Sequence, residues 1–137
     1  MTELELIHLM RERDITPTQQ RLEIAHILLA KPQHVSADQI LAMVNKDGAL
    51  VSKATVYNTL KLFAAKGLVR EVIVDPAKVF YDSTTTPHFH IYNVDTGSLM
   101  DVDADRVSLG HLPPLPEGTV TDGVDVIIRV KNTAAAI

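Results

Sequence analysis

Residues 52–82 read SKATVYNTLKLFAAKGLVREVIVDPAKVFYD, and the period of the apolar residues changes within this stretch. Val56, Leu60 and Phe63 recur at helical spacing, and Gly67 behind them is a typical left-handed helix terminator. After the glycine, β-branched and apolar residues form two short runs joined through residues 76–78, a pattern typical of a hairpin. The stretch therefore predicts a helix followed by a two-stranded wing.

Three more helices are predicted upstream of this stretch. Apolar residues at helical spacing indicate a first helix over residues 3–13. Thr and Pro at 16–17, as N-cap and first helical residue, start a second helix that ends at about residue 30. The capping-box motif SADQ (36–39) starts a third helix over residues 37–46. Helices followed by a wing in this order predict a winged helix-turn-helix.

The second half of the chain favours strands. HFHIYNV (88–94) and SLMDV (98–102) flank a turn and predict a hairpin, three prolines between residues 110 and 118 disfavour a long helix, and VDVIIRVK (124–131) predicts a last strand. We therefore expect an α+β protein made of a winged-helix DNA-binding domain (1–82), a hinge (83–87) and a small C-terminal α/β dimerisation and metal-sensing domain (88–137).

The amino-acid composition excludes cysteine-based sites and argues against a membrane or secreted protein. The 137 residues include 13 Lys and Arg, 17 Asp and Glu, and no Cys, so disulfides, thiolate zinc sites and cysteine nucleophiles are excluded. No apolar run approaches the roughly 18 residues of a membrane span, and the first residues do not resemble a secretory signal, so we expect a cytoplasmic protein.

Charge is distributed unevenly along the chain. Residues 1–86 carry ten bases and ten acids, whereas residues 87–137 carry three bases and seven acids. Residues 48–70 hold four bases and no acid, which indicates a basic patch or a solvated helix face.

The helix of residues 52–66 is the expected DNA reader. At 100° per residue, Ala54, Tyr57, Asn58 and Lys61 share the face opposite the apolar stripe. In a major groove, Ala and Tyr can contact thymine methyls, Asn can pair with adenine edges, and Lys can neutralise phosphate. Alternatively, the tyrosine packs at a helix junction and the asparagine faces water. The residues predicted to contact a double-stranded operator are Arg21, Ser52, Lys53, Ala54, Thr55, Tyr57, Asn58 and Lys61.

Two histidines stand two residues apart in the strand predicted after the connector. Because side chains alternate along a strand, His88 and His90 project from one face, as metal ligation from a strand requires. Asp82 lies upstream across the connector, Asp101 on the partner strand, and His34 in the loop before the third helix. Three imidazoles and two carboxylates suit Fe(II), Mn(II) or Zn(II). The alternative is that the histidines are structural.

Asp103 is the alternative carboxylate to Asp101. We expect Asp103 to point to the opposite face of its strand, so Asp101 is preferred. A cation held by ligands from both halves would fix the angle between them, and in a homodimer that angle would set the separation of two recognition helices.

Five motifs together resemble one known family. They are PTQQR (17–21), HVSAD (34–38), ATVYNTLKLF (54–63), GLV (67–69) and HFH (88–90). In this order and spacing they resemble the ferric uptake regulator (Fur) superfamily. The resemblance implies a dimeric winged-helix repressor or activator whose DNA affinity follows a divalent metal, Fe(II) or Mn(II), bound at the five His and Asp positions. Asp at both carboxylate positions resembles the peroxide-sensing branch, in which Fe(II) reacts with hydrogen peroxide and a ligand histidine is oxidised.

The chain also departs from the family pattern. The first of two family CxxC pairs falls on Asn93 and Thr96, and the second is missing, so no structural cysteine–zinc site is expected. The additional family site needs polar ligands where Pro87 and Phe89 stand. ATVYNTL and the ending LPPLPEG–VDVIIRVK look closest to the iron response regulator (Irr) branch, which uses haem in some members.

Several functions follow from these patterns. The leading one is a metal-dependent transcriptional regulator of iron homeostasis or peroxide response. A haem-responsive regulator and a metal-independent winged-helix interaction module are the alternatives. We expect no enzyme, because five protein ligands leave little open coordination at a metal and no separate general base is visible.

Overall fold

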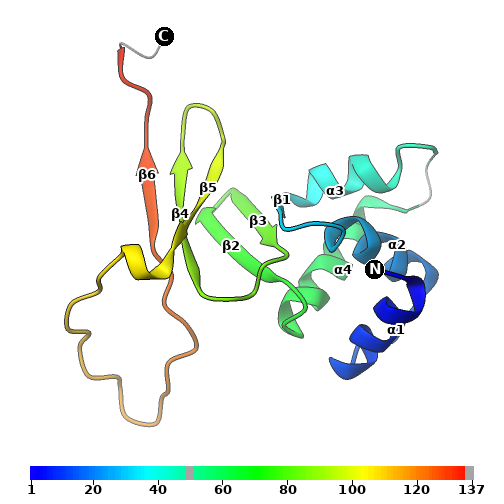
Figure 1. Ribbon diagram of the computed structural model, residues 1–137, viewed down its shortest axis with the longest axis horizontal. Helices are drawn as coiled ribbons and strands as arrows, with labels where there is room; N and C mark the ends of the chain where they lie inside the picture. Colours follow the sequence, from blue (N-terminus) through cyan, green and yellow to red (C-terminus); the bar gives the residue numbers. More distant parts are fainter. Residues whose placement is uncertain (49–50, 135–137) are drawn as a thin grey trace. The chain divides into compact units, whose positions relative to one another are not determined.

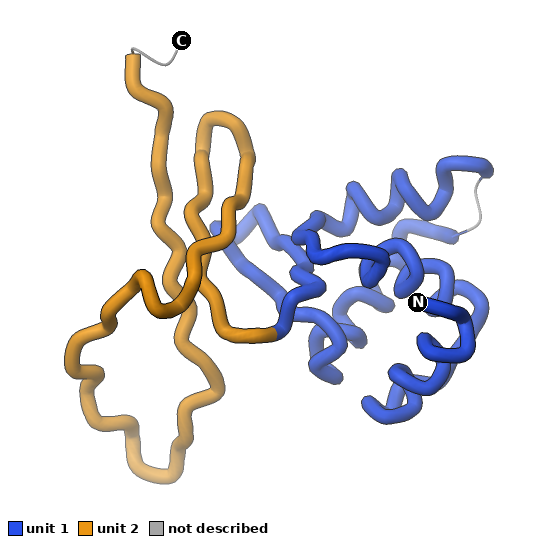
Figure 2. Tube along the Cα trace, in the orientation of Figure 1, with its two compact units in different colours: residues 1–85 blue, residues 86–137 orange. Residues whose placement is uncertain are grey.

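The chain forms two compact units, residues 1–85 and residues 86–137, coloured separately in Figure 2. The computed structural model describes residues 1–48 and 51–134. Residues 135–137 of the predicted dimerisation domain therefore lie outside the described residues. Within the described ranges, no helix is long and apolar enough to cross a membrane.

The first unit contains four helices and a three-stranded sheet (Figure 1). Its elements are α1 (Glu3–Glu12), α2 (Gln19–Leu28), β1 (His34–Val35), α3 (Ala37–Val44), α4 (Lys53–Ala65), β2 (Arg70–Asp75) and β3 (Lys78–Asp82). The capping box predicted for α3 is present, because Ser36 accepts the Gln39 N–H while the Gln39 side chain accepts the Ser36 N–H. Ser52 caps α4, and Gly67 beyond it has φ +76°.

The start of α2 differs from the prediction. The N-cap is Thr18, whose hydroxyl accepts the Arg21 N–H at 3.2 Å. The predicted cap, Thr16, instead uses its carbonyl to accept the Arg21 guanidinium at 2.7 Å. The helix therefore begins two residues later than predicted, and it ends at Leu28.

The predicted inward stripe of α4 lies at the centre of the first unit. Val56, Leu60 and Phe63 are all fully buried, and α1, α2 and α3 contribute buried apolar side chains to the same core. Burying a side chain of this size contributes about 1.5–3 kcal/mol, so this stripe fixes α4 on the other helices and leaves its opposite face outward.

The wing has one strand more than predicted. Its strand order is β1-β3-β2, all antiparallel, and β1 pairs His34 with Asp82 and Val35 with Tyr81. The prediction that His34 lies in a loop was therefore wrong. This two-residue strand ties the segment before α3 to the last strand of the wing.

The second unit is a small sheet of order β5-β4-β6. It contains β4 (His88–Asn93), β5 (Leu99–Asp103), a 3-10 turn at Ala104–Arg106 and β6 (Ile127–Val130). The predicted hairpin is present as the antiparallel pair β4–β5, and the predicted last strand pairs with β4 in parallel. The predicted absence of a long helix in the proline-rich region is also met, because residues 107–126 contain no helix or strand.

Candidate metal centre and nucleic-acid interface

The two histidines of β4 are buried polar groups. Burial alternates along the strand, and His88 and His90 are both on its buried side, with exposed fractions of 7% and 1%. Their rings are 4.6 Å apart between centroids and meet edge to face. Buried histidines usually have polar partners, so their surroundings indicate their role.

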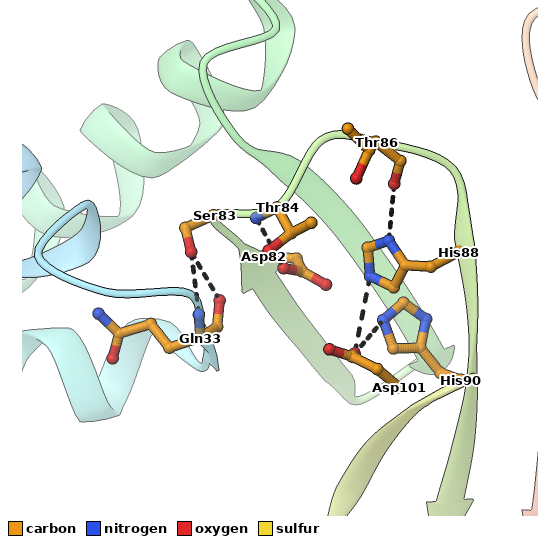
Figure 3. Close-up of polar contacts among 8 residues, drawn as sticks. All are labelled: Gln33, Asp82, Ser83, Thr84, Thr86, His88, His90 and Asp101. Carbon is orange, nitrogen blue, oxygen red and sulfur yellow. Dashed lines mark hydrogen bonds and ion pairs between the residues drawn. The ribbon is translucent and has the colours of Figure 1, made fainter. Parts of the chain in front are cut away.

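Asp101 brings a carboxylate to the same place from the partner strand. It lies opposite His90 in the β4–β5 register. Its Oδ1 is 3.4 Å from His90 Nε2 and 3.6 Å from His88 Nε2, so both imidazoles direct the same nitrogen at one carboxylate oxygen (Figure 3). Potential ligand atoms of these three side chains lie within 4.8 Å of one another.

A backbone contact sets the tautomer of His88. Its Nδ1 is 2.7 Å from the carbonyl oxygen of Thr86, and a carbonyl can only accept a hydrogen bond. Nδ1 must therefore carry the proton and donate it, which leaves the lone pair of a neutral imidazole on Nε2. Metal-bound histidines commonly have this arrangement, with the second nitrogen donating to a carbonyl.

The other two predicted ligands belong to the first unit. His34 and Asp82 face each other as a pair of the β1–β3 ladder. Asp82 is 1% exposed, and its Oδ1 accepts the N–H of Thr84 at 2.9 Å. Next to it, Ser83 holds the strand ends together, because its Oγ accepts the Gln33 N–H at 2.9 Å (Figure 3). Within this unit, the structure thus brings one imidazole and one carboxylate to adjacent strands.

The expectation for Asp103 was wrong. The β4–β5 register places Asp103 opposite His88 and Asp101 opposite His90. Residues two apart on a strand share a face, so both carboxylates are on the histidine side. Asp101 is the one whose oxygen is grouped with the histidine nitrogens in the described part of the chain.

The outward face of α4 is polar and carries positive charge. Ala54, Asn58 and Lys61 are exposed, as are Ser52 and Lys53 at its first turn, whereas Thr55 is half-buried. The described residues of the 48–70 basic patch thus present hydrogen-bond donors, two lysine cations and a small apolar side chain on one face. These are the groups that bind base edges and phosphates.

Tyr57 packs at a helix junction, which is the alternative to DNA contact that the sequence left open. Its ring is half-buried against the core, and its hydroxyl donates to Asp38 of α3 at 2.9 Å. The hydrogen bond to Asp38 is the main cause that raises the pKa of Tyr57, followed by burial and the negative charge of the same carboxylate. Sequence reasoning missed Asp38, because no local pattern signals a contact between residues 19 apart.

Arg21, one of the predicted operator contacts, lies in the first turn of α2. Its guanidinium donates to the carbonyl of Thr16, and the residue borders an open cavity of about 700 Å³ between α2 and α4. Thr55 and Asn58 border the same cavity. Three of the predicted DNA contacts therefore surround one cleft of the helix pair.

A network of hydrogen bonds surrounds Asn93 and Thr96, which stand where the family has its first CxxC pair. The Asn93 Oδ1 accepts the N–H groups of Asp95 at 2.9 Å and Thr96 at 3.1 Å, and its Nδ2 donates to Asn132 at 2.8 Å. The Asn132 N–H in turn donates to Asp95 Oδ2 at 2.8 Å. The turn after β4 is thus joined to the chain that follows β6.

Comparison with known proteins assigns the family. The model of the ferric uptake regulator family matches residues 12–110, which contain the winged helix and the strands that carry the histidines. The chain belongs to the ferric uptake regulator family. The predicted superfamily is therefore confirmed, whereas the closer resemblance to the Irr branch stays a prediction.

The chain is also similar in sequence to an individual known protein. The peroxide-responsive repressor of Staphylococcus aureus is 32% identical over 97 residues, which are 71% of this chain and 66% of that protein. The chain thus spans slightly less than two thirds of this relative.

Solved structures of the family share the fold. The ferric uptake regulator of Pseudomonas aeruginosa, determined with manganese, has a TM-score of 0.69 and 24% identity, covering 96% of this chain and 98% of its own. The peroxide stress regulator of Campylobacter jejuni has a TM-score of 0.59 and 23% identity, covering 97% and 98%. These similarities confirm the α+β fold.

Proposed function

We propose that this protein is a metal-dependent DNA-binding transcriptional regulator that controls iron homeostasis or peroxide-response genes. The observation that carries the proposal is the convergence of His88, His90 and Asp101 in a chain whose helix α4 exposes a polar, basic face. Family membership supports this reading, because the match includes both features.

The donor chemistry fits a divalent cation of intermediate softness. Two imidazole nitrogens and a carboxylate oxygen suit Fe(II), Mn(II) and Zn(II), and the chain has no thiolate to favour a structural zinc site. The proton on Nδ1 of His88 leaves Nε2 as its binding atom. When bound, the cation would supply positive charge that neutralises the carboxylates around it.

We infer that His34 and Asp82 complete the ligand set. They come from the first unit and are paired on β1 and β3, and the short connector of residues 83–87 separates Asp82 from His88 in the sequence. A cation that requires ligands from both units would favour one arrangement of the first unit, with its DNA-recognition helix α4, relative to the second unit. Metal binding would thereby change DNA affinity without touching DNA.

A homodimer is the proposed assembly. Many large apolar side chains of the second unit are exposed, which is unusual for an isolated small domain. On the sheet itself these are Met100 of β5 together with Ile128 and Val130 of β6. A second copy that covers them would place two recognition helices at a fixed spacing, as palindromic half-sites require.

DNA binding with and without metal tests the proposal. A duplex selected by the protein from a random pool would be titrated at constant salt with Mn(II), Fe(II), Zn(II), haem or a chelator. We expect tight binding with Mn(II) or Fe(II), loss of binding with chelator, and loss in His90→Ala. His111→Ala, which removes an exposed histidine of the same unit, is the matched control. Equal binding with and without metal would favour the metal-independent module, and a response to haem alone would favour the haem-responsive regulator.

A further inference from the structure

Asp38 is an acid beside the proposed DNA-reading face. It lies in the first turn of α3, and its carboxylate accepts the hydroxyl of Tyr57 from α4 at 2.9 Å. An acid next to phosphates weakens DNA binding through charge repulsion. A benefit from the contact of Asp38 with Tyr57 would offset this repulsion.

A second contact holds the same tyrosine. The Nζ of Lys53 lies 5.6 Å from the centroid of the Tyr57 ring, within the range of a cation–π contact. Lys53 is the first residue of α4, one turn before Tyr57. The ring is thus held at its hydroxyl by α3, at its face by the start of α4, and along its inner side by the core.

We propose that Asp38 is a positioning residue for DNA recognition, which fixes the ring of Tyr57 on the reading face before DNA arrives. The inference rests on the proposed function. A side chain that is already ordered loses less conformational entropy on binding, so the matching sequence gains affinity while random sequence gains little. Because the hydroxyl donates to Asp38, the ring itself is what Tyr57 offers to DNA.

Two variants of Asp38 separate its charge from its hydrogen bond. Asp38→Asn removes the charge but keeps an oxygen that can accept from Tyr57, whereas Asp38→Ala removes both. Both variants lose the same repulsion, so the difference between them measures positioning. Tyr57→Phe removes the donor and leaves the ring.

The experiment measures the ratio of affinities for a duplex selected by the wild-type protein and for a random-sequence duplex, with Mn(II) present. A hydrogen bond of this kind is worth about threefold to tenfold in affinity. We expect the ratio to fall by that factor in Asp38→Ala and Tyr57→Phe, to fall no further in the double variant, and to stay near the wild-type value in Asp38→Asn. Asp47→Ala, which removes an exposed acid beyond the end of α3, should leave the ratio unchanged.

Each outcome is decisive. Equal ratios in Asp38→Ala and Asp38→Asn, or additive losses in the double variant, would overturn the positioning role. A wild-type protein that does not distinguish the two duplexes would instead overturn the proposed function. Alkaline titration of tyrosine absorbance gives an independent readout, because the ionisation lost in Tyr57→Phe should move to lower pH in Asp38→Ala.

Discussion

Asn93→Ala should loosen the contact between the end of β4 and the chain that follows β6. The asparagine side chain makes three hydrogen bonds, two from backbone N–H groups of the turn and one to Asn132 beyond β6. Each such bond contributes about 0.5–1.5 kcal/mol, and exposed ones lie at the lower end. We therefore expect a local loss of about 1–3 kcal/mol for Asn93→Ala. Asn132→Ala removes one of the three bonds, so its loss should be about 0.5–1 kcal/mol.

Amide hydrogen exchange can measure this loss at the two ends of β6. The Val94 N–H donates to the carbonyl of Val130 at 2.9 Å, close to the asparagine network, and the His90 N–H donates to the carbonyl of Val126 at 3.2 Å at the other end. In Asn93→Ala, the Val94 amide should exchange about 5- to 140-fold faster, since 1.4 kcal/mol corresponds to tenfold, whereas the His90 amide should change little. Thr133→Ala is the control variant.

Two results would refute this reasoning. If Val94 in Asn93→Ala exchanges within twofold of the wild-type rate, the network does not hold the strand. If a chelator produces the same acceleration in the wild-type protein, a metal holds this end of the sheet in place of the hydrogen bonds.

Three further predictions concern the capping box, the metal chemistry and the tyrosine. Ser36→Ala should lower the free energy of unfolding in urea by about 1 kcal/mol, because the Gln39 N–H at 3.2 Å loses its acceptor, and a change below 0.3 kcal/mol would contradict the cap. After hydrogen peroxide with Fe(II), but not with Mn(II), mass spectrometry should find one added oxygen on the peptide of His34 or His88, and unmodified peptides would exclude peroxide sensing. Because the pKa of Tyr57 is raised above its ordinary value of 10.0, the folded state favours the protonated form. The stability from its bond to Asp38 is therefore present below about pH 10 and lost as pH rises through the raised pKa, and Tyr57→Phe should lack this dependence in alkaline urea titrations.

Local signals in the sequence were sufficient for most of the fold. The helix α4 was predicted because its apolar stripe, its cap and its terminating glycine agree with one another. The hairpin of the second unit followed from two strand-like runs that flank a turn. The alternation of side chains along a strand puts His88 and His90 on one side of β4.

The failures have a common physical cause. The two-residue strand at His34 is too short to produce a periodic pattern, and it exists because of pairing with a segment far along the chain. Thr16 and Thr18 are both acceptable N-caps locally, and the contact of Arg21 with the Thr16 carbonyl accompanies the later start. The bond between Asp38 and Tyr57 likewise depends on how α3 packs on α4. Each of these features depends on tertiary contacts, to which sequence periodicity is blind.

A short series of contacts inside the first unit joins His34, a proposed metal ligand, to α4, the proposed DNA-recognition helix. His34 lies in β1, the cap of α3 follows two residues later, and Asp38 in the first turn of α3 binds Tyr57 on α4. A cation that holds His34 would therefore act on the start of α3 directly, as well as on the arrangement of the two units. Coupling between binding sites is reciprocal, so DNA should tighten metal binding by the factor with which metal tightens DNA binding. If α3 carries part of this coupling, Asp38→Ala should reduce both factors equally while leaving the metal affinity of the DNA-free protein unchanged.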